Sequence, residues 1–185
     1  MITIISPAKS LDFESALPEI ETTTPEFSEQ SAQIMTKLKK LSKKKVSELM
    51  KLSKDLTELN VHRYQMWDPS FDDDHSRPAL MTFSGEVFRG IDAQSLNTEQ
   101  LNFSQKHLRI LSGLHGLLRP LDKIRPYRLE MGTSLPIGRK KNLYQYWGDQ
   151  ITNALNTALE AADSSTLVNL ASSEYFRAVN FDKVN

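Results

Sequence analysis

The sequence predicts a mixed α/β fold, of α+β type, in which several helices surround one central sheet. Short apolar segments at residues 1–6 and 166–171 are typical of buried strands. Longer segments carry apolar residues at helical spacing, most clearly residues 143–162. A length of 185 residues suits one domain covering residues 1–185. A chain of this size buries roughly 70% of its unfolded surface, so it needs no disulfide bonds, and the absence of cysteine excludes them.

The N-terminal half of the chain predicts one strand followed by three helices. Residues 1–6 form the strand, and the polar, proline-containing residues 6–25 form a loop. Apolar residues recur at approximately helical spacing over residues 26–41. Ser42 and Ser53 are suited to cap two further helices. In the second of these helices Leu56, Leu59 and Tyr64 recur at helical spacing, and Pro69 disfavours its continuation beyond Trp67 and Asp68.

The C-terminal half alternates between the two kinds of element. Residues 79–88 alternate apolar and polar side chains and predict a strand, and residues 99–118 predict a helix that Pro120 stops. Residues 127–131 alternate as an extended segment does. An amphipathic helix is expected over residues 143–162, then a strand at 166–171 and a helical turn at 172–179.

Charge is segregated along the chain although its sum is zero, with 23 basic and 23 acidic residues. Residues 37–54 hold eight lysines and one acid, and residues 106–141 hold nine basic residues and two acids. Residues 12–29, by contrast, carry six acids and no base. A phosphate responds to the local potential within a Debye length of about 8 Å. We therefore expect the two basic segments to share one electropositive surface; the plainer alternative is two solvated helix faces.

Residues 42–67 predict two short helices joined by a tight turn at residues 51–53. In a helix-hairpin-helix unit the backbone N–H groups of such a turn point at a phosphate. The candidate DNA-binding lysines of this segment are Lys43, Lys44, Lys45, Lys51 and Lys54. Lys51 and Ser53 stand where glycines are usual in such a turn, so an ordinary packing hairpin is an equal alternative.

Three arginines lie in the turn-rich residues 119–128, where prolines restrict the backbone. Arg119, Arg125 and Arg128 are candidates for bidentate phosphate contacts, which a rigid backbone positions. In an extended segment Arg128 and Glu130 point to the same face, so each can influence the ionisation of the other. An internal ion pair that anchors the loop is the favoured alternative to catalysis.

The ends of the first and last predicted strands carry further polar residues. Lys9 follows the first strand, and Glu174 and Tyr175 follow the last. Ligand sites in sheets with helical crossovers lie beyond the carboxyl ends of strands. If the two strands are parallel neighbours, Lys9 and Glu174 meet in one cleft, so Lys9, Glu174 and Tyr175 are candidate catalytic residues. Glu130, beside Arg128, is a fourth candidate. Helix capping by Ser172 and Ser173 is the alternative explanation for this polar segment.

No metal site and no cofactor are expected. The four histidines, His62, His75, His107 and His115, show no ligand spacing. The sequence contains no glycine-rich nucleotide fingerprint and no Gly-x-Ser-x-Gly elbow. The apolar start of the chain is too short for a signal peptide or a membrane span, so a cytoplasmic protein with no membrane partner is expected.

The chain resembles the peroxide stress resistance protein YaaA family at several ordered stretches. They are residues 5–12, 83–90, 108–133, 143–149 and 168–176, of which 108–133 is the most specific. The resemblance implies a cytosolic bacterial protein that limits damage by hydrogen peroxide and keeps unincorporated iron low. It also implies DNA binding through a basic cleft, with a helix-hairpin-helix element at residues 42–67. Family members usually continue for several tens of residues beyond the position of Asn185.

The prediction from sequence is a DNA-binding protein of the peroxide stress response that reads the backbone of double-stranded or structured DNA. The alternative is an enzyme that acts on nucleic acid or a nucleotide, with Glu130 or Glu174 as general acid or base. Direct iron sequestration is the least favoured function, because suitable ligands are lacking. The sequence does not predict the oligomeric state.

Overall fold

The computed structural model describes residues 1–185, and its centre is a four-stranded mixed sheet in the order β6-β5-β1-β8. β1 (Ile2–Ile5) runs parallel to both β5 (Leu108–Ser112) and β8 (Leu167–Asn169), and β6 (Gly116–Leu118) is antiparallel to β5. Thr3 pairs with Leu108 on one side and with Val168 on the other. The mixed α/β prediction is confirmed.

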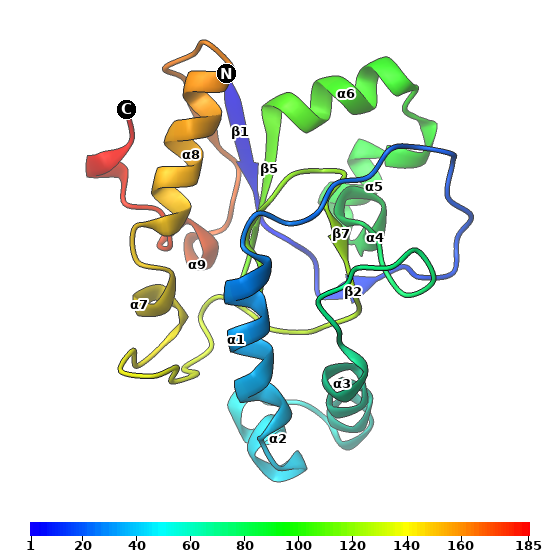
Figure 1. The fold of residues 1–185 in the computed structure, drawn as a ribbon, viewed down its shortest axis with the longest axis vertical. Helices are drawn as coiled ribbons and strands as arrows, with labels where there is room; N and C mark the ends of the chain where they lie inside the picture. Colours follow the sequence, from blue (N-terminus) through cyan, green and yellow to red (C-terminus); the bar gives the residue numbers. More distant parts are fainter.

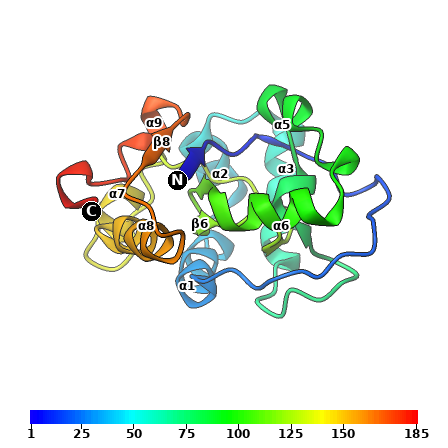
Figure 2. The same ribbon diagram turned by 90° about the horizontal axis from the view of Figure 1, so that it is seen from above.

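Three consecutive helices form one end of the molecule, and two other helices flank the sheet at the other end. In Figure 1, α1, α2 and α3 project away from the sheet, whereas α6 and α8 lie on either side of β1 and β5. Figure 2 shows α6 and α8 apart in the view from above. The bounds of these helices are α1 Ser28–Lys39, α2 Lys43–Met50, α3 Lys54–Met66, α6 Thr98–His107 and α8 Gln150–Ala161. None of the helices has the length and apolar character needed to cross a bilayer.

Short elements hold the long connections in place. Two small antiparallel ladders join β2 (Ser10–Leu11) to β4 (Phe83–Ser84) and β3 (Arg77–Pro78) to β7 (Lys123–Ile124). The remaining elements are α4 Ala79–Thr82, α5 Glu86–Ile91, α7 Leu143–Trp147, α9 Ser173–Phe176 and two 3-10 turns at Ala93–Ser95 and Phe181–Lys183.

The strand predicted at residues 79–88 is wrong. This segment contains the short helices α4 and α5, with only two residues of strand between them. Every residue of α4 is buried, including Thr82, whose hydroxyl donates to the carbonyl of Pro78. Because a fully buried segment has no solvent-facing side, alternation in its sequence does not report on its secondary structure.

The helix predicted at residues 99–118 is correct only in its first half. α6 ends at His107, and the chain continues as the central strand β5 and then β6. Leu111, Leu114 and Leu118 are buried as expected, although no helix holds them. An apolar run that is buried on all sides fits a helix and a strand equally well. The helix predicted at 143–162 is likewise divided, because Gly148 adopts a φ of 49° between α7 and α8.

The helix α3 forms as predicted but turns a polar face to the core. Of the three recurring residues, only Tyr64 is buried, and Leu56 and Leu59 are exposed. The other buried residues of α3 are Thr57 and Asn60, which hydrogen bond to backbone carbonyls of the same helix region. Tyr64 Oη donates to the carbonyl of Arg128 at 2.5 Å, so α3 is anchored to residues 125–131 by a hydrogen bond as well as by packing.

Candidate functional site

A tight turn at residues 51–53 joins α2 to α3. Ser42 Oγ accepts from the N–H of Lys45, and Ser53 Oγ accepts from the N–H of Leu56, so both helices carry the N-caps predicted from the sequence. Lys51 ends α2 with a φ of 52° and a ψ of 50°. This left-handed conformation is the one that glycine adopts without strain. Lys51 therefore adopts the conformation expected of the missing glycine.

The five lysines of this hairpin are all exposed. Lys43 lies 3.5 Å from Glu58, and Lys44 lies 3.9 Å from Glu48. Exposed pairs of this kind contribute little and are readily exchanged for other anions. Lys45, Lys51 and Lys54 have no carboxylate within ion-pairing distance. The hairpin thus presents a surface of net positive charge that could bind phosphates.

The three candidate arginines, by contrast, each have a carboxylate partner within the protein. Arg119 lies 2.7 Å from the buried Asp122 and also donates to the carbonyl of Thr24. Arg125 is buried against Asp72, with Asp68 at 3.9 Å. Arg119 lines a hollow beside α8, so it does not join the lysines of α2 and α3 in one surface. The internal ion pair favoured from the sequence, Arg128 with Glu130, is present at 3.1 Å, and Arg119 and Arg125 form further internal pairs that the sequence did not predict.

A cluster of charged side chains joins the segment after β1 to residues 128–130. Glu130 Oε1 lies 3.1 Å from Lys9 Nζ and 3.1 Å from Arg128 Nη2. Glu130 and Arg128 are mostly buried, whereas Lys9 is exposed. The Nε–H of Arg128 is buried and has no acceptor. Three of the predicted residues therefore meet at one point, where Glu130 balances two cations and one positive charge is in excess.

The carboxyl ends of β1 and β8 also meet. Ser6 Oγ accepts from the N–H of Ser172 at 2.9 Å and lies 3.2 Å from Ser172 Oγ. Glu174 Oε1 accepts from the N–H of Gly132 at 2.8 Å. This hydrogen bond holds Glu174 against the backbone at a point two residues after Glu130. Tyr175 is buried, and burial raises the pKa of its phenol. A shallow hollow of about 20 Å³ between Lys9, Glu130 and Tyr175 is too small for a substrate in this conformation.

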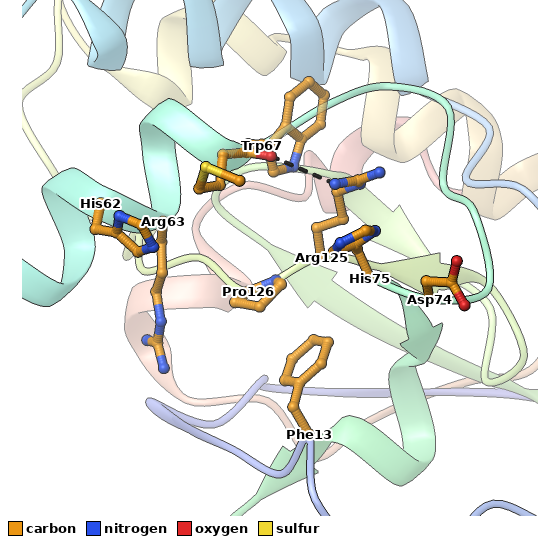
Figure 3. Close-up of a pocket in the computed structure, with 9 residues that line it drawn as sticks. Phe13, His62, Arg63, Trp67, Asp74, His75, Arg125 and Pro126 are labelled. Atoms are coloured by element: carbon orange, nitrogen blue, oxygen red, sulfur yellow. Dashed lines mark hydrogen bonds between the residues drawn. The ribbon is translucent and has the colours of Figure 1, made fainter.

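A larger cavity of about 330 Å³ lies beside α3, and it was not predicted from the sequence. Its lining residues come from four separate segments: Phe13, His62, Arg63, Met66, Trp67, Asp74, His75, Arg125 and Pro126 (Figure 3). Arg63 is half-buried on α3, and no carboxylate pairs with it. Burial lowers the pKa of Arg63, and the charge of Arg128 adds to this effect. Arg63 follows the buried Asn60 at helical spacing, so its side chain faces partly inward.

The structure contains no group of three or more histidine, aspartate or glutamate side chains placed to hold a metal ion. In the acidic loop at residues 72–75, Asp72 is occupied by Arg125 and by Nδ1 of His75 at 2.8 Å. The hydrogen bond to His75 and the nearby positive charge of Arg125 lower the pKa of Asp72 to about 2. This loop acts as a structural clamp on Arg125.

Comparison with known proteins supplies the family. A family model described as "Peroxide stress protein YaaA" matches residues 1–185. The chain is 50% identical over 179 residues to UPF0246 protein IL2146 of Idiomarina loihiensis, which covers 97% of this chain and 69% of that protein. It is 49% identical over 179 residues to a UPF0246 protein of Aliivibrio fischeri, with the same coverage of each. A UPF0246 protein of Hahella chejuensis is 47% identical over 184 residues, covering 100% of this chain and 72% of that protein.

Proposed function

Because the chain belongs to the peroxide stress protein YaaA family, we propose that it acts in the response to hydrogen peroxide by binding DNA through the helical hairpin α2–α3. The observation that carries this proposal is the group of exposed lysines around the turn at Lys51. Lys45, Lys51 and Lys54 lack carboxylate partners, and two helix N-termini at Ser42 and Ser53 add positive potential.

Binding of this kind reads the backbone and not the bases. Lysines are point charges that neutralise phosphates without base information. Neutralisation releases cations that are condensed on DNA. We propose that this exchange moves ferrous iron away from the phosphates, where its reaction with peroxide would damage DNA. This connects DNA binding to the iron and peroxide phenotype expected of the family.

The test is fluorescence anisotropy on a labelled duplex with Lys45→Glu/Lys54→Glu. Both substitutions place an acid in the first turn of a helix, where it is favourable, so they should not unfold the hairpin. The variant should bind unrelated duplexes equally weakly, and the slope of log affinity against log salt should fall by about 2, roughly 0.9 for each lost phosphate contact. The control is Arg89→Glu/Lys106→Glu, which makes the same charge change at the exposed ends of α5 and α6. An unchanged slope in the hairpin variant would refute the proposal.

A second function is favoured by the contact of Lys9, Arg128 and Glu130. We propose as the alternative an enzyme acting on nucleic acid or a nucleotide, in which Glu130 exchanges a proton with substrate and the two cations hold a phosphate. Glu130→Gln and Glu174→Gln variants that still bind DNA but fail to protect cells against peroxide would support the enzyme. Full protection by both variants would remove it.

A further inference from the structure

The cavity beside α3 combines an aromatic ring, a proline and an unpaired guanidinium. In Figure 3 the ring of Phe13 points toward Pro126, Arg63 and His62 lie on one side of the space, and Asp74 and His75 lie on the other. Its volume of about 330 Å³ is at the lower end of the range of small-molecule sites, which is roughly 300 to 1,000 Å³. The cavity can therefore admit one small ligand.

The charges around the cavity favour an anion at Arg63. Arg125 is neutralised by Asp72 and Asp68, and His75 also pairs with Asp72. Arg63 has no such partner and experiences the like charge of Arg128. The exposed acid Asp74 lies across the cavity from Arg63 (Figure 3). A partly desolvated guanidinium without a counter-charge is a site for a phosphate or carboxylate, and its fork suits a phosphate.

The walls of the cavity favour a flat ring. Phe13 and Pro126 offer apolar surface, and stacking of bases on aromatic side chains is a main source of affinity in single-strand binding. Nucleobases are flat aromatic rings that stack on surfaces of this kind. A ring of this kind linked to a phosphate is a nucleotide.

We propose that this cavity binds one nucleotide, with its base against Phe13 and Pro126 and its phosphate on Arg63. The nucleotide can be a free monophosphate or one unpaired residue of a DNA strand; the second source rests on the proposed function. Lys54 and Arg63 lie on the same helix, about 14 Å apart along its axis at 1.5 Å per residue. A strand whose phosphates contact the hairpin can therefore reach the cavity along α3.

The first experiment titrates the protein with dAMP, deoxyadenosine and inorganic phosphate, followed by calorimetry and by the fluorescence of Trp67. Saturable binding of dAMP is expected. Arg63→Gln should weaken dAMP by roughly tenfold or more and leave deoxyadenosine unchanged, because only the charge-assisted contact is lost. Phe13→Ala should weaken both. Trp67→Phe should abolish the fluorescence change while calorimetric binding persists. Arg89→Gln, an exposed arginine elsewhere, is the matched control.

The second arm separates the two sources and the two proposals. If a single-stranded oligonucleotide binds more tightly than dAMP, and Phe13→Ala removes this difference, the ligand is a residue of a strand. If the oligonucleotide binds no more tightly than dAMP, the ligand is the free monophosphate. Lys45→Glu/Lys54→Glu should retain dAMP binding even when duplex binding is lost. The nucleotide site is refuted if the calorimetric binding of dAMP and of the oligonucleotide is absent, or is unchanged by both Arg63→Gln and Phe13→Ala. The duplex-binding result for the hairpin does not depend on this outcome.

Discussion

The ammonium of Lys9 lies 3.1 Å from Oε1 of Glu130, so the segment that follows the central strand β1 is fastened to a segment that belongs to no sheet. The same oxygen accepts from Arg128, but the two contacts are unequal in burial. The side chain of Lys9 is 66% exposed, whereas that of Arg128 is 17% exposed. An exposed ion pair is screened by water, and a mostly buried one is not.

We predict that Glu130→Gln is more destabilising than Lys9→Gln. Removal of the carboxylate leaves Arg128 mostly buried without a counter-charge, which should lower the free energy of unfolding by about 1 to 2 kcal/mol. Removal of the ammonium breaks only an exposed pair and should cost less than about 1 kcal/mol. Urea unfolding of the two variants measures the difference. Equal losses would mean that Arg128 does not depend on Glu130 for its balance.

Lys51→Gly should stabilise the hairpin. Lys51 holds a φ of 52°, which costs a residue with a β-carbon about 1 kcal/mol relative to glycine. Lys51→Ala removes the same charge but keeps the β-carbon, so it isolates the backbone term. In a denaturant titration, the free energy of unfolding of the glycine variant should exceed that of the alanine variant by about 0.5 to 1 kcal/mol. If alanine proves as stable as glycine, the turn is not left-handed in solution.

The sequence predicts this fold best where local signals agree. Ser42 and Ser53 mark the starts of α2 and α3 correctly, because a cap is a contact within one turn of helix. The strand β5 was missed because Ile110 and Leu111 are buried on both faces, and burial of this kind is decided by the neighbouring strands. The polar inward face of α3 could not be predicted either, since Tyr64 is held by the carbonyl of Arg128, far away in the chain.

The candidate site, like the fold, could be predicted from the sequence only in part. The rule that parallel strands end at one edge predicts that Lys9 meets Glu174, because the two residues follow β1 and β8. Lys9 pairs instead with Glu130, which lies outside the sheet and which this rule does not place. The pairing of Arg125 with Asp72 depends on how the loop at residues 68–76 folds over the arginine, which no periodic pattern encodes. Arg63 was overlooked because its lack of a partner is a property of the folded environment.

Gly113→Ala should be strongly destabilising and Gly90→Ala should not. A β-carbon on Gly113 would lie 2.4 Å from the carbonyl oxygen of Leu129, and this backbone cannot move without displacing Glu130. We expect a loss of about 2 to 3 kcal/mol, as for other overpacked sites. Gly90 lies in α5 with nothing within 4 Å of the added carbon, so alanine there should be neutral or slightly stabilising. Thermal denaturation of both variants distinguishes a steric requirement from a general intolerance of substitution.

His115 should make the protein less stable as the pH falls. Its ring is fully buried against Ser31, Phe71 and Tyr127, its Nδ1 lies 3.0 Å from Ser31 Oγ, and no charged group contacts it. Burial lowers the pKa of His115 to about 3 from the ordinary 6.5. Between these values the unfolded chain binds a proton that the folded chain does not, so the free energy of unfolding rises with pH and falls on acidification.

This titration should contribute up to about 1.4 kcal/mol for each pH unit below 6.5, the free-energy equivalent of one pKa unit. His115→Gln lacks the titration, so the parent should lose stability relative to this variant as the pH is lowered from 6.5 to 5. That interval lies above the range in which the carboxylates with lowered pKa, Asp12 and Asp72, become protonated. Urea unfolding at several pH values measures the divergence. A constant difference between parent and variant would show that the folded state protonates His115 as readily as the unfolded state, and hence that water reaches its ring.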